Sequence, residues 1–277
     1  MNTLRINGTE LACAERGEGE TLILVHGAVG DLRSWENVAT KLATRFHVVS
    51  YSRRWHYPSF QPVSAGSYTV ETHTADLLAV LKHFGPAHVV GHSYGAAIGT
   101  VAVLQAPELV KTLTLAEPAL FSLLQGSEHG RRAAEVAGLA TSRVPALLQQ
   151  GKRDRALTEF LDVILGPSGA ERISTLGLSI MRDNLHTLAP MLEKVNAESP
   201  FTTQHAAQIS MPTLLLDGAQ TPAIFRITAN ELNQAIPDVQ RITLPEVSHG
   251  LHLENPDSFT HAVLPFLIEA KSGVVNT

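Results

Sequence analysis

Residues 88–99 read His-Val-Val-Gly-His-Ser-Tyr-Gly-Ala-Ala-Ile-Gly and contain the pattern Gly-x-Ser-x-Gly from Gly91 to Gly95. A short apolar run precedes this pattern and small residues follow it, as expected for a sharp turn from a buried strand into a helix. Such a turn strains the serine backbone and leaves no space for side chains at the flanking positions. The stretch therefore predicts that Ser93 presents its hydroxyl as a nucleophile. The alternative is an ordinary glycine-rich turn whose serine caps the helix.

Candidate strands and helices alternate on both sides of this turn. The alternating polar and apolar residues at 3–7 and 10–16 predict an edge hairpin. The other predicted strands, most of them apolar runs that suit burial on both faces, lie at 21–26, 46–51, 88–91, 111–117, 213–217 and 239–244. Apolar spacing or small-residue content predicts helices at 34–43, 69–84, 94–105, 223–235 and 257–270. The alternation indicates an α/β fold with a mostly parallel twisted sheet and helices on both faces.

The alternation breaks after the predicted strand that ends at Glu117. From 119 to 209 the pattern is mostly helical, with interruptions at prolines. A structureless loop of that length would be implausible in a compact domain. We therefore predict a core domain of residues 1–118 and 210–277, with residues 119–209 inserted into it as a helical lid. Ligands of open α/β sheets bind outside the carboxyl ends of the strands, so the lid is expected to cover the site.

Composition excludes several classes of protein. Of the 277 residues, 44% are hydrophobic and 17% are charged, whereas disordered chains are poor in apolar residues and rich in charge. The formal net charge of −5 argues against nucleic acid as the main partner, because phosphate binding needs a basic face. The single cysteine, Cys13, can form no internal disulfide. The sequence shows no apolar run of spanning length and no signal-peptide layout. We expect a soluble cytoplasmic protein that binds neither nucleic acid nor membranes.

Patterns typical of metal and cofactor sites are absent from the sequence. It holds no Cys-x-x-Cys, no His-Glu-x-x-His, no P-loop and no dinucleotide-binding fingerprint. His129, His186 and His205 are scattered through the predicted lid and are interpreted as surface or pocket-lining residues. We therefore expect a small-molecule partner, no cofactor and no metal.

The serine needs a base, because a hydroxyl is a weak nucleophile. Among the 13 histidines, His249 is favoured by its place just beyond the last predicted strand, in a loop late in the chain. His252 is the rival and is expected to face the following helix. The alternative for His249 is a loop histidine bonded only to backbone.

Three motifs in this order resemble the α/β-hydrolase family over nearly the whole chain. They are His26-Gly27 after an early strand, the turn around Ser93, and Ser-His-Gly-Leu-His-Leu-Glu-Asn-Pro at 248–256. The resemblance implies an α/β-hydrolase fold in which Ser93 is the nucleophile and His249 is its base.

The same resemblance implies an oxyanion hole formed by the backbone N–H groups of Ala28 and Tyr94. Backbone donors suit this task because they are fixed where negative charge develops. Ala28 has no side-chain donor, unlike the halide-binding asparagine of dehalogenases. A serine at position 93 disfavours dehalogenase and epoxide hydrolase chemistry, because an aspartate nucleophile gives an alkyl ester and a serine gives an acyl-enzyme.

The third member of the catalytic triad departs from the family's commonest pattern. Many relatives place an aspartate in the turn after the strand at 213–217, where this chain has Thr221. Some relatives, including many haloalkane dehalogenases, place the acid at the end of the strand after the nucleophile helix, which corresponds here to Glu117. We predict Glu117 as the acid and keep Asp217 as the runner-up. The alternative for Glu117 is a capping or salt-bridging group at the mouth of the lid.

The loop Tyr-Ser-Arg-Arg-Trp-His-Tyr-Pro at 51–58 is bulkier than the glycine-rich loop of many relatives. Arg53 occupies the family's arginine position and is interpreted as structural. The arginine pair of this loop could meet a substrate carboxylate, and the alternative is a solvated surface pair. The residues predicted to bind substrate are Arg54, Trp55, Tyr57 and His92.

These residues favour a serine hydrolase that cleaves a small-molecule ester, lactone or thioester through an acyl-enzyme on Ser93. One alternative is a carbon–carbon bond hydrolase, or a cofactor-free enzyme that uses His249 mainly as a base. Another is a ligand receptor that keeps a vestigial triad, since a fold alone does not guarantee activity.

Overall fold

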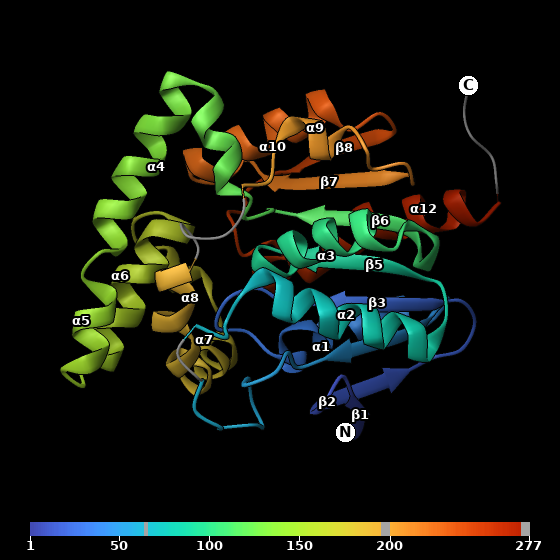
Figure 1. Ribbon diagram of the computed structural model, residues 1–277, viewed down its shortest axis with the longest axis horizontal. Helices are drawn as coiled ribbons and strands as arrows, with labels where there is room; N and C mark the ends of the chain where they lie inside the picture. The colour runs from blue at the N-terminus through green and yellow to red at the C-terminus, as the bar shows by residue number, and fades with distance from the viewer. Residues whose placement is uncertain (64–65, 195–199, 273–277) are drawn as a thin grey trace.

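The computed structural model describes residues 1–63, 66–194 and 200–272. An eight-stranded sheet runs through it in the order β1-β2-β4-β3-β5-β6-β7-β8 (Figure 1). Its strands are β1 (Asn2–Ile6), β2 (Thr9–Arg16), β3 (Thr21–Val25), β4 (His47–Tyr51), β5 (Ala87–His92), β6 (Val110–Ala116), β7 (Thr213–Gly218) and β8 (Val239–Leu244). Strand β2 pairs antiparallel with β1 and β4, and all other pairs are parallel. The predicted edge hairpin and mostly parallel sheet are confirmed.

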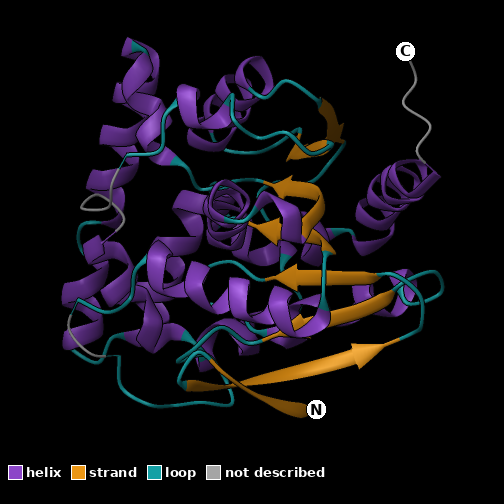
Figure 2. Cartoon of the chain, turned by 45° about the vertical axis from the view of Figure 1, so that its right-hand side comes forward, coloured by secondary structure: helices purple, strands orange, loops and turns teal. Residues whose placement is uncertain are grey.

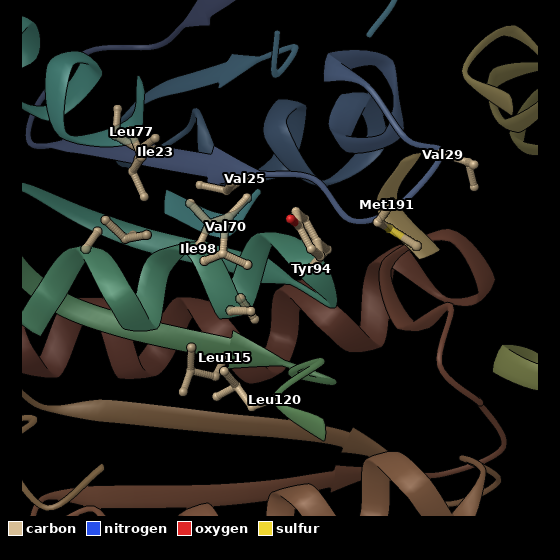
Figure 3. Packing of buried hydrophobic residues seen from close by; sticks show 14 of the residues in the cluster. Ile23, Val25, Val29, Val70, Leu77, Tyr94, Ile98, Leu115, Leu120 and Met191 are labelled. Carbon is tan, nitrogen blue, oxygen red and sulfur yellow. The ribbon is translucent and has the colours of Figure 1, made fainter. Parts of the chain in front are cut away.

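Helices cover both faces of the sheet (Figure 2). Because successive strand residues point to opposite faces, β3 sends Leu22 and Leu24 into one core cluster and Ile23 and Val25 into another. The first cluster includes side chains of α1 (Glu36–Leu42) and α12 (Pro256–Ser272). The second includes side chains of α2 (Val70–Phe84), α3 (Tyr94–Gln105) and α10 (Ala223–Ala235), and Figure 3 shows part of it.

The helical region predicted at 34–43 begins earlier than expected, at Leu32. A 3-10 turn, η1 (Leu32–Trp35), precedes α1. The carboxylate of Asp31 accepts a hydrogen bond from the backbone N–H of Arg33, while the hydroxyl of Ser34 accepts one from the N–H of Asp31. This reciprocal cap starts the helical region earlier than apolar spacing alone indicates.

Residues 119–209, which make up most of the chain between β6 and β7, are called the helical segment. Its elements are η3 (Phe121–Gly126), α4 (Glu128–Thr141), α5 (Val144–Gln149), α6 (Arg153–Leu165), η4 (Gly169–Arg172), α7 (Thr175–Asp183), η5 (Leu185–Thr187), α8 (Leu188–Lys194) and α9 (Thr203–Ala206). Helices α4 to α8 lie beyond the carboxyl ends of the parallel strands (Figure 1). The division into a core domain and a lid stays a prediction.

Within the described parts of the chain, every helix is too short or too polar to span a lipid bilayer.

Candidate active site

Ser93 lies at the turn between β5 and α3 and has a positive φ of 53°, with ψ −117°. Non-glycine residues seldom adopt a positive φ, so the surroundings must hold it there. A Cβ on Gly91 would lie 2.6 Å from the carbonyl oxygen of Gly95, and one on Gly95 would lie 2.2 Å from that of Val25. Both positions therefore require glycine, which is the physical reason for the sequence pattern.

The loop after β8 is held by the carboxylate of Glu254 in α11 (Leu251–Glu254). This carboxylate accepts hydrogen bonds from the backbone N–H groups of Ser248 (3.1 Å) and Gly250 (3.0 Å). It also accepts one from the Ser248 hydroxyl at 2.6 Å. His249 lies between these two anchored residues, so its backbone is fixed on both sides.

The imidazole of His249 is buried, with 2% of its surface exposed, and it lines the same cavity as Ser93. The ring of Phe225, near the start of α10, stacks on it with 3.8 Å between the ring centroids. The structure thus brings the predicted nucleophile and the predicted base to one cavity, and Phe225 covers one face of the base.

Glu117 follows β6 directly and is fully buried, with a φ of 51°. Its Oε2 lies 3.3 Å from Nδ1 of His249 and accepts a hydrogen bond from the Thr221 hydroxyl at 2.6 Å. Its Oε1 accepts a hydrogen bond from the backbone N–H of Gly218 at 2.7 Å. Thr221, which occupies the commoner acid position, thus serves as a donor to the glutamate that points at the histidine.

Asp217 lies in β7, and its carboxylate is bound to β8. It accepts hydrogen bonds from Nη2 (2.6 Å) and Nε (3.1 Å) of Arg241 and from the Thr243 hydroxyl at 3.0 Å. These contacts occupy both carboxylate oxygens. Of the two candidate acids, the geometry therefore offers His249 the carboxylate of Glu117.

Burial favours the neutral form of both groups and therefore shifts their pKa values in opposite directions. It raises the pKa of Glu117 to about 7, although the hydrogen bonds from Thr221 and Gly218 favour the carboxylate form and oppose the rise. It lowers the pKa of His249 to about 3. A neutral imidazole is the form that accepts a proton, so His249 is in the state that a general base needs at neutral pH.

His92 lines the same cavity as Ser93 and His249, but its ring is already engaged. Its Nε2–H donates a hydrogen bond to the backbone carbonyl of His249 at 2.8 Å. Burial lowers the pKa of His92 to about 3, so the ring is neutral. The rival His252 lines the same cavity, but its ring stacks on Trp35 with 4.2 Å between ring centroids, and the carboxylate of Glu117 is hydrogen-bonded to His249 instead.

Ala28 and Tyr94, the predicted oxyanion-hole residues, line a second cavity together with Ser93. Tyr94 opens α3, and the N-terminus of a helix carries partial positive charge. The carbonyl of Gly27, in the peptide group that also holds the Ala28 N–H, accepts a hydrogen bond from the buried Arg53 guanidinium at 2.9 Å. This contact fixes the orientation of that peptide group, since its six atoms are planar.

The structure places the bulky loop residues away from Ser93. Arg54 forms a salt bridge with Asp76, and Trp55 packs on Tyr68 at 5.7 Å between ring centroids.

Tyr57 lies under the guanidinium of Arg33, 3.6 Å from the ring centroid. Arg54, Trp55 and Tyr57 do not line either cavity at Ser93. The geometry gives no support to a substrate-binding role for these three residues.

The three histidines of the helical segment are also separate from the site. His129 lines an outer surface groove, and Nε2 of His186 lies 2.8 Å from the carbonyl oxygen of Trp55. Nδ1 of His205 accepts a hydrogen bond from the backbone N–H of Thr202 at the start of α9. In the described ranges, no cluster of His, Cys, Asp and Glu could hold a metal ion.

Sequence reasoning missed Phe225 and the lining that the helical segment contributes. Phe225 belongs to a helix that was predicted, but nothing in the sequence near it points to His249. On α4, small residues at Ala134, Ala137, Gly138 and Thr141 line the second cavity. Their spacing of three and four marks one helix face, a signal that was present in the sequence.

Comparison with known proteins identifies relatives that are hydrolases by name. An uncharacterized hydrolase of Bacillus subtilis, YraK, is 40% identical over 129 residues, which are 46% of this chain and 47% of that protein. The mouse sn-1-specific diacylglycerol lipase ABHD11 is 25% identical over 89% of this chain and 80% of its own length.

Among solved structures, an alpha/beta hydrolase from Sphaerobacter thermophilus matches with a TM-score of 0.74 and 28% identity. That match covers 98% of this chain and all of the other. The family model for the alpha/beta hydrolase fold matches residues 20–256. The chain therefore belongs to the alpha/beta hydrolase fold family, as its three motifs predicted.

Proposed function

We propose that the protein is a serine hydrolase that cleaves a small-molecule carboxylic ester, lactone or thioester through an acyl-enzyme on Ser93. The observation that carries the proposal is the 3.3 Å approach of Glu117 Oε2 to Nδ1 of His249, with His249 and Ser93 lining one cavity. The relatives named as hydrolase and lipase support the same class of reaction.

In the first half-reaction, His249 takes the proton of the Ser93 hydroxyl while the serine oxygen attacks the substrate carbonyl carbon. The backbone N–H groups of Ala28 and Tyr94 stabilise the oxyanion that forms. The imidazolium then gives the proton to the leaving oxygen or sulfur, and the bond between that atom and the carbonyl carbon breaks. The product is an acyl-enzyme and a free alcohol or thiol, or, from a lactone, an acyl-enzyme whose acyl group carries the new hydroxyl.

In the second half-reaction, water takes the place of the serine as nucleophile. His249 accepts a proton from this water, which attacks the acyl carbonyl and forms a second oxyanion in the same place. The proton then returns to Ser93 as the acid leaves. Throughout, the Glu117 carboxylate holds Nδ1 of His249 and stabilises the positive charge that appears on the ring.

The test is the intact mass of the protein after exposure to a small fluorophosphonate, for the wild type, Ser93→Ala and a control, Ser122→Ala. The control removes a half-buried hydroxyl bonded to the carbonyl of Phe201 in the helical segment. We expect one adduct on the wild type and the control and none on Ser93→Ala. Equal labelling of Ser93→Ala, or ester turnover that survives this change but not His249→Gln, would contradict the acyl-enzyme and favour a reaction in which His249 acts alone.

A further inference from the structure

Two cavities meet at Ser93, and both are also lined by Ala28 and Ile164. The larger has a volume of about 120 Å³ and lies between α4, α6, α8 and α10. The smaller has a volume of about 30 Å³ and lies against α7 and the loop of His249. A substrate bound to Ser93 therefore has two directions in which its parts can extend.

Among the described residues that line the larger cavity, none carries a charged side chain. Its large apolar lining residues include Phe121, Phe160, Val163, Met191, Leu192 and Ile224. On its α4 side the lining residues are small, so the helix leaves space there instead of filling it. An apolar group gains free energy by entering such a space, whereas a carboxylate would lose its hydration without a partner.

The smaller cavity has different walls. It is bordered by the loop that contains Gly27 and Gly30, by Met181 of α7, and by the imidazoles of His92 and His249. His249 does not line the larger cavity.

The chemistry of ester cleavage decides which part of the substrate occupies which cavity. The leaving oxygen receives its proton from the same imidazole that deprotonated the serine. The leaving group must therefore lie on the His249 side, and the acyl group must extend the other way.

On this basis we propose that the substrate is an ester or thioester with an extended apolar acyl chain and a leaving group of only a few heavy atoms. The acyl chain occupies the larger cavity and the leaving group the smaller one. This inference rests on the proposed acyl-enzyme at Ser93, and it adds the substrate class that the proposed function leaves open.

The far end of the larger cavity limits the length of the acyl chain. Ala137, Val163 and Ile224 line both this cavity and an open groove on the outside of α4 and α6. They form the wall between the buried space and the surface, and the groove beyond them includes the charged residues Arg132 and Asp162. A chain that reaches this wall loses the benefit of further methylene groups, so an optimum length is expected.

The first experiment measures kcat/KM from acid release for the methyl esters of acetic, butyric, hexanoic, octanoic and decanoic acids. Each buried methylene group contributes roughly fourfold, so we expect a rise of at least about 100-fold from acetate to the optimum. A second series, the octanoate esters of methanol, butanol and octanol, should fall as the alcohol lengthens. A flat acyl series, or a preference for the longer alcohols, overturns the assignment of the cavities.

Matched variants on α4 locate the acyl chain. Ala134 lines only the larger cavity, and Ala140 lines only the outer groove. Ala134→Leu is expected to lower kcat/KM for methyl octanoate by about tenfold or more, because two or more methylene groups of the acyl chain can no longer be buried. The value of kcat/KM for methyl acetate should stay unchanged. Ala140→Leu, the same change on the same helix, should leave both values unchanged. If both variants shift the series equally, or neither does, the acyl chain does not lie against α4.

A second variant guards against a folding failure of Ala134→Leu. A Cβ on Gly138 meets nothing within 4 Å, and leucine is a better helix former than glycine. Gly138→Leu should therefore fold and shorten the preferred chain in the same way.

Labelling of Ser93 by a small fluorophosphonate separates the two proposals. If Ser93 is labelled and the acyl series is flat, the serine hydrolase stands and the substrate class is wrong. If Ser93 is not labelled and none of the esters is cleaved, both are wrong.

Discussion

Strands β6 and β7 lie side by side, and an acidic residue stands at the carboxyl end of each, yet the two carboxylates have opposite surroundings. Glu117 is turned toward Nδ1 of His249 and accepts hydrogen bonds from Gly218 and Thr221. Asp217 is turned toward β8 and is bound by Arg241. Ala116 and Leu216 are register partners, so Glu117 and Asp217 lie at the same level of the two strands. Glu117 lies one residue past the end of β6 and has a positive φ of 51°, whereas Asp217 is still within β7 and paired with Thr243. The change of backbone direction at 117 therefore decides which acid meets the histidine. Burial is nearly equal, at 0% and 2% exposed, and does not distinguish them.

The largest expected effect comes from removing the charge of Glu117. A neutral side chain at this position cannot stabilise the imidazolium that forms on His249. Glu117→Gln should therefore lower kcat for ester hydrolysis by about 10³- to 10⁴-fold. Acid release under saturating substrate measures this, and a loss of less than about tenfold would contradict a role for Glu117 in the proposed triad.

A carboxylate moved from position 117 to position 221 tests whether the histidine needs the acid at the end of β6. The Thr221 hydroxyl lies 2.6 Å from Oε2 of Glu117, so an aspartate at 221 would bring a carboxylate close to the same place. Glu117→Ala combined with Thr221→Asp should recover about 10- to 100-fold of the activity that Glu117→Ala loses. Thr221→Asp alone should lower activity, because two carboxylates in contact raise each other's pKa. A double variant no more active than Glu117→Ala would show that the site depends on the glutamate position itself.

The smallest expected effect on activity comes from Asp217. Asp217→Asn should leave kcat/KM within about threefold while lowering the free energy of unfolding by roughly 1–3 kcal/mol, because it weakens buried hydrogen bonds to a charged partner. Urea denaturation measures this loss. Asp154→Asn is the control, since Asp154 pairs with Arg182 at an exposed site and should change stability by at most about 0.5 kcal/mol. A large loss of kcat in folded Asp217→Asn would reverse the roles of the two acids.

The sheet and the turn at Ser93 could be predicted because their determinants are local. Parallel strands buried on both faces appear as apolar runs, and the close approach at Gly91 and Gly95 excludes other residues whatever the rest of the chain does. The strand end that carries Glu117 was predictable for the same reason, because the carboxyl ends of parallel strands share one edge of the sheet.

Loop side chains were less predictable because their directions depend on distant partners. Arg54 was predicted to bind substrate, but it is bound by Asp76 of α2. Tyr57 was predicted to bind substrate too, but it lies under Arg33. Neither partner is near its residue in the sequence.

The face of α4 that lines the larger cavity could not be predicted from the sequence. Helical spacing on α4 groups its small residues into faces, but two of these faces carry small residues. The spacing does not say which face lies toward Ser93, since that depends on how α4 packs against α6 and η3.

The contacts of Glu117 also join the chain just before the helical segment to the strand that follows it, β7. Its backbone N–H donates to the carbonyl of Leu216 at 2.9 Å, and its side chain binds the N–H of Gly218, 101 residues further along the chain. The chain thus leaves the sheet and returns to it at adjacent points that are bonded to each other. A segment attached in this way can be exchanged or lengthened without moving Glu117, so the pocket for the substrate can change while the proposed catalytic residues keep their places.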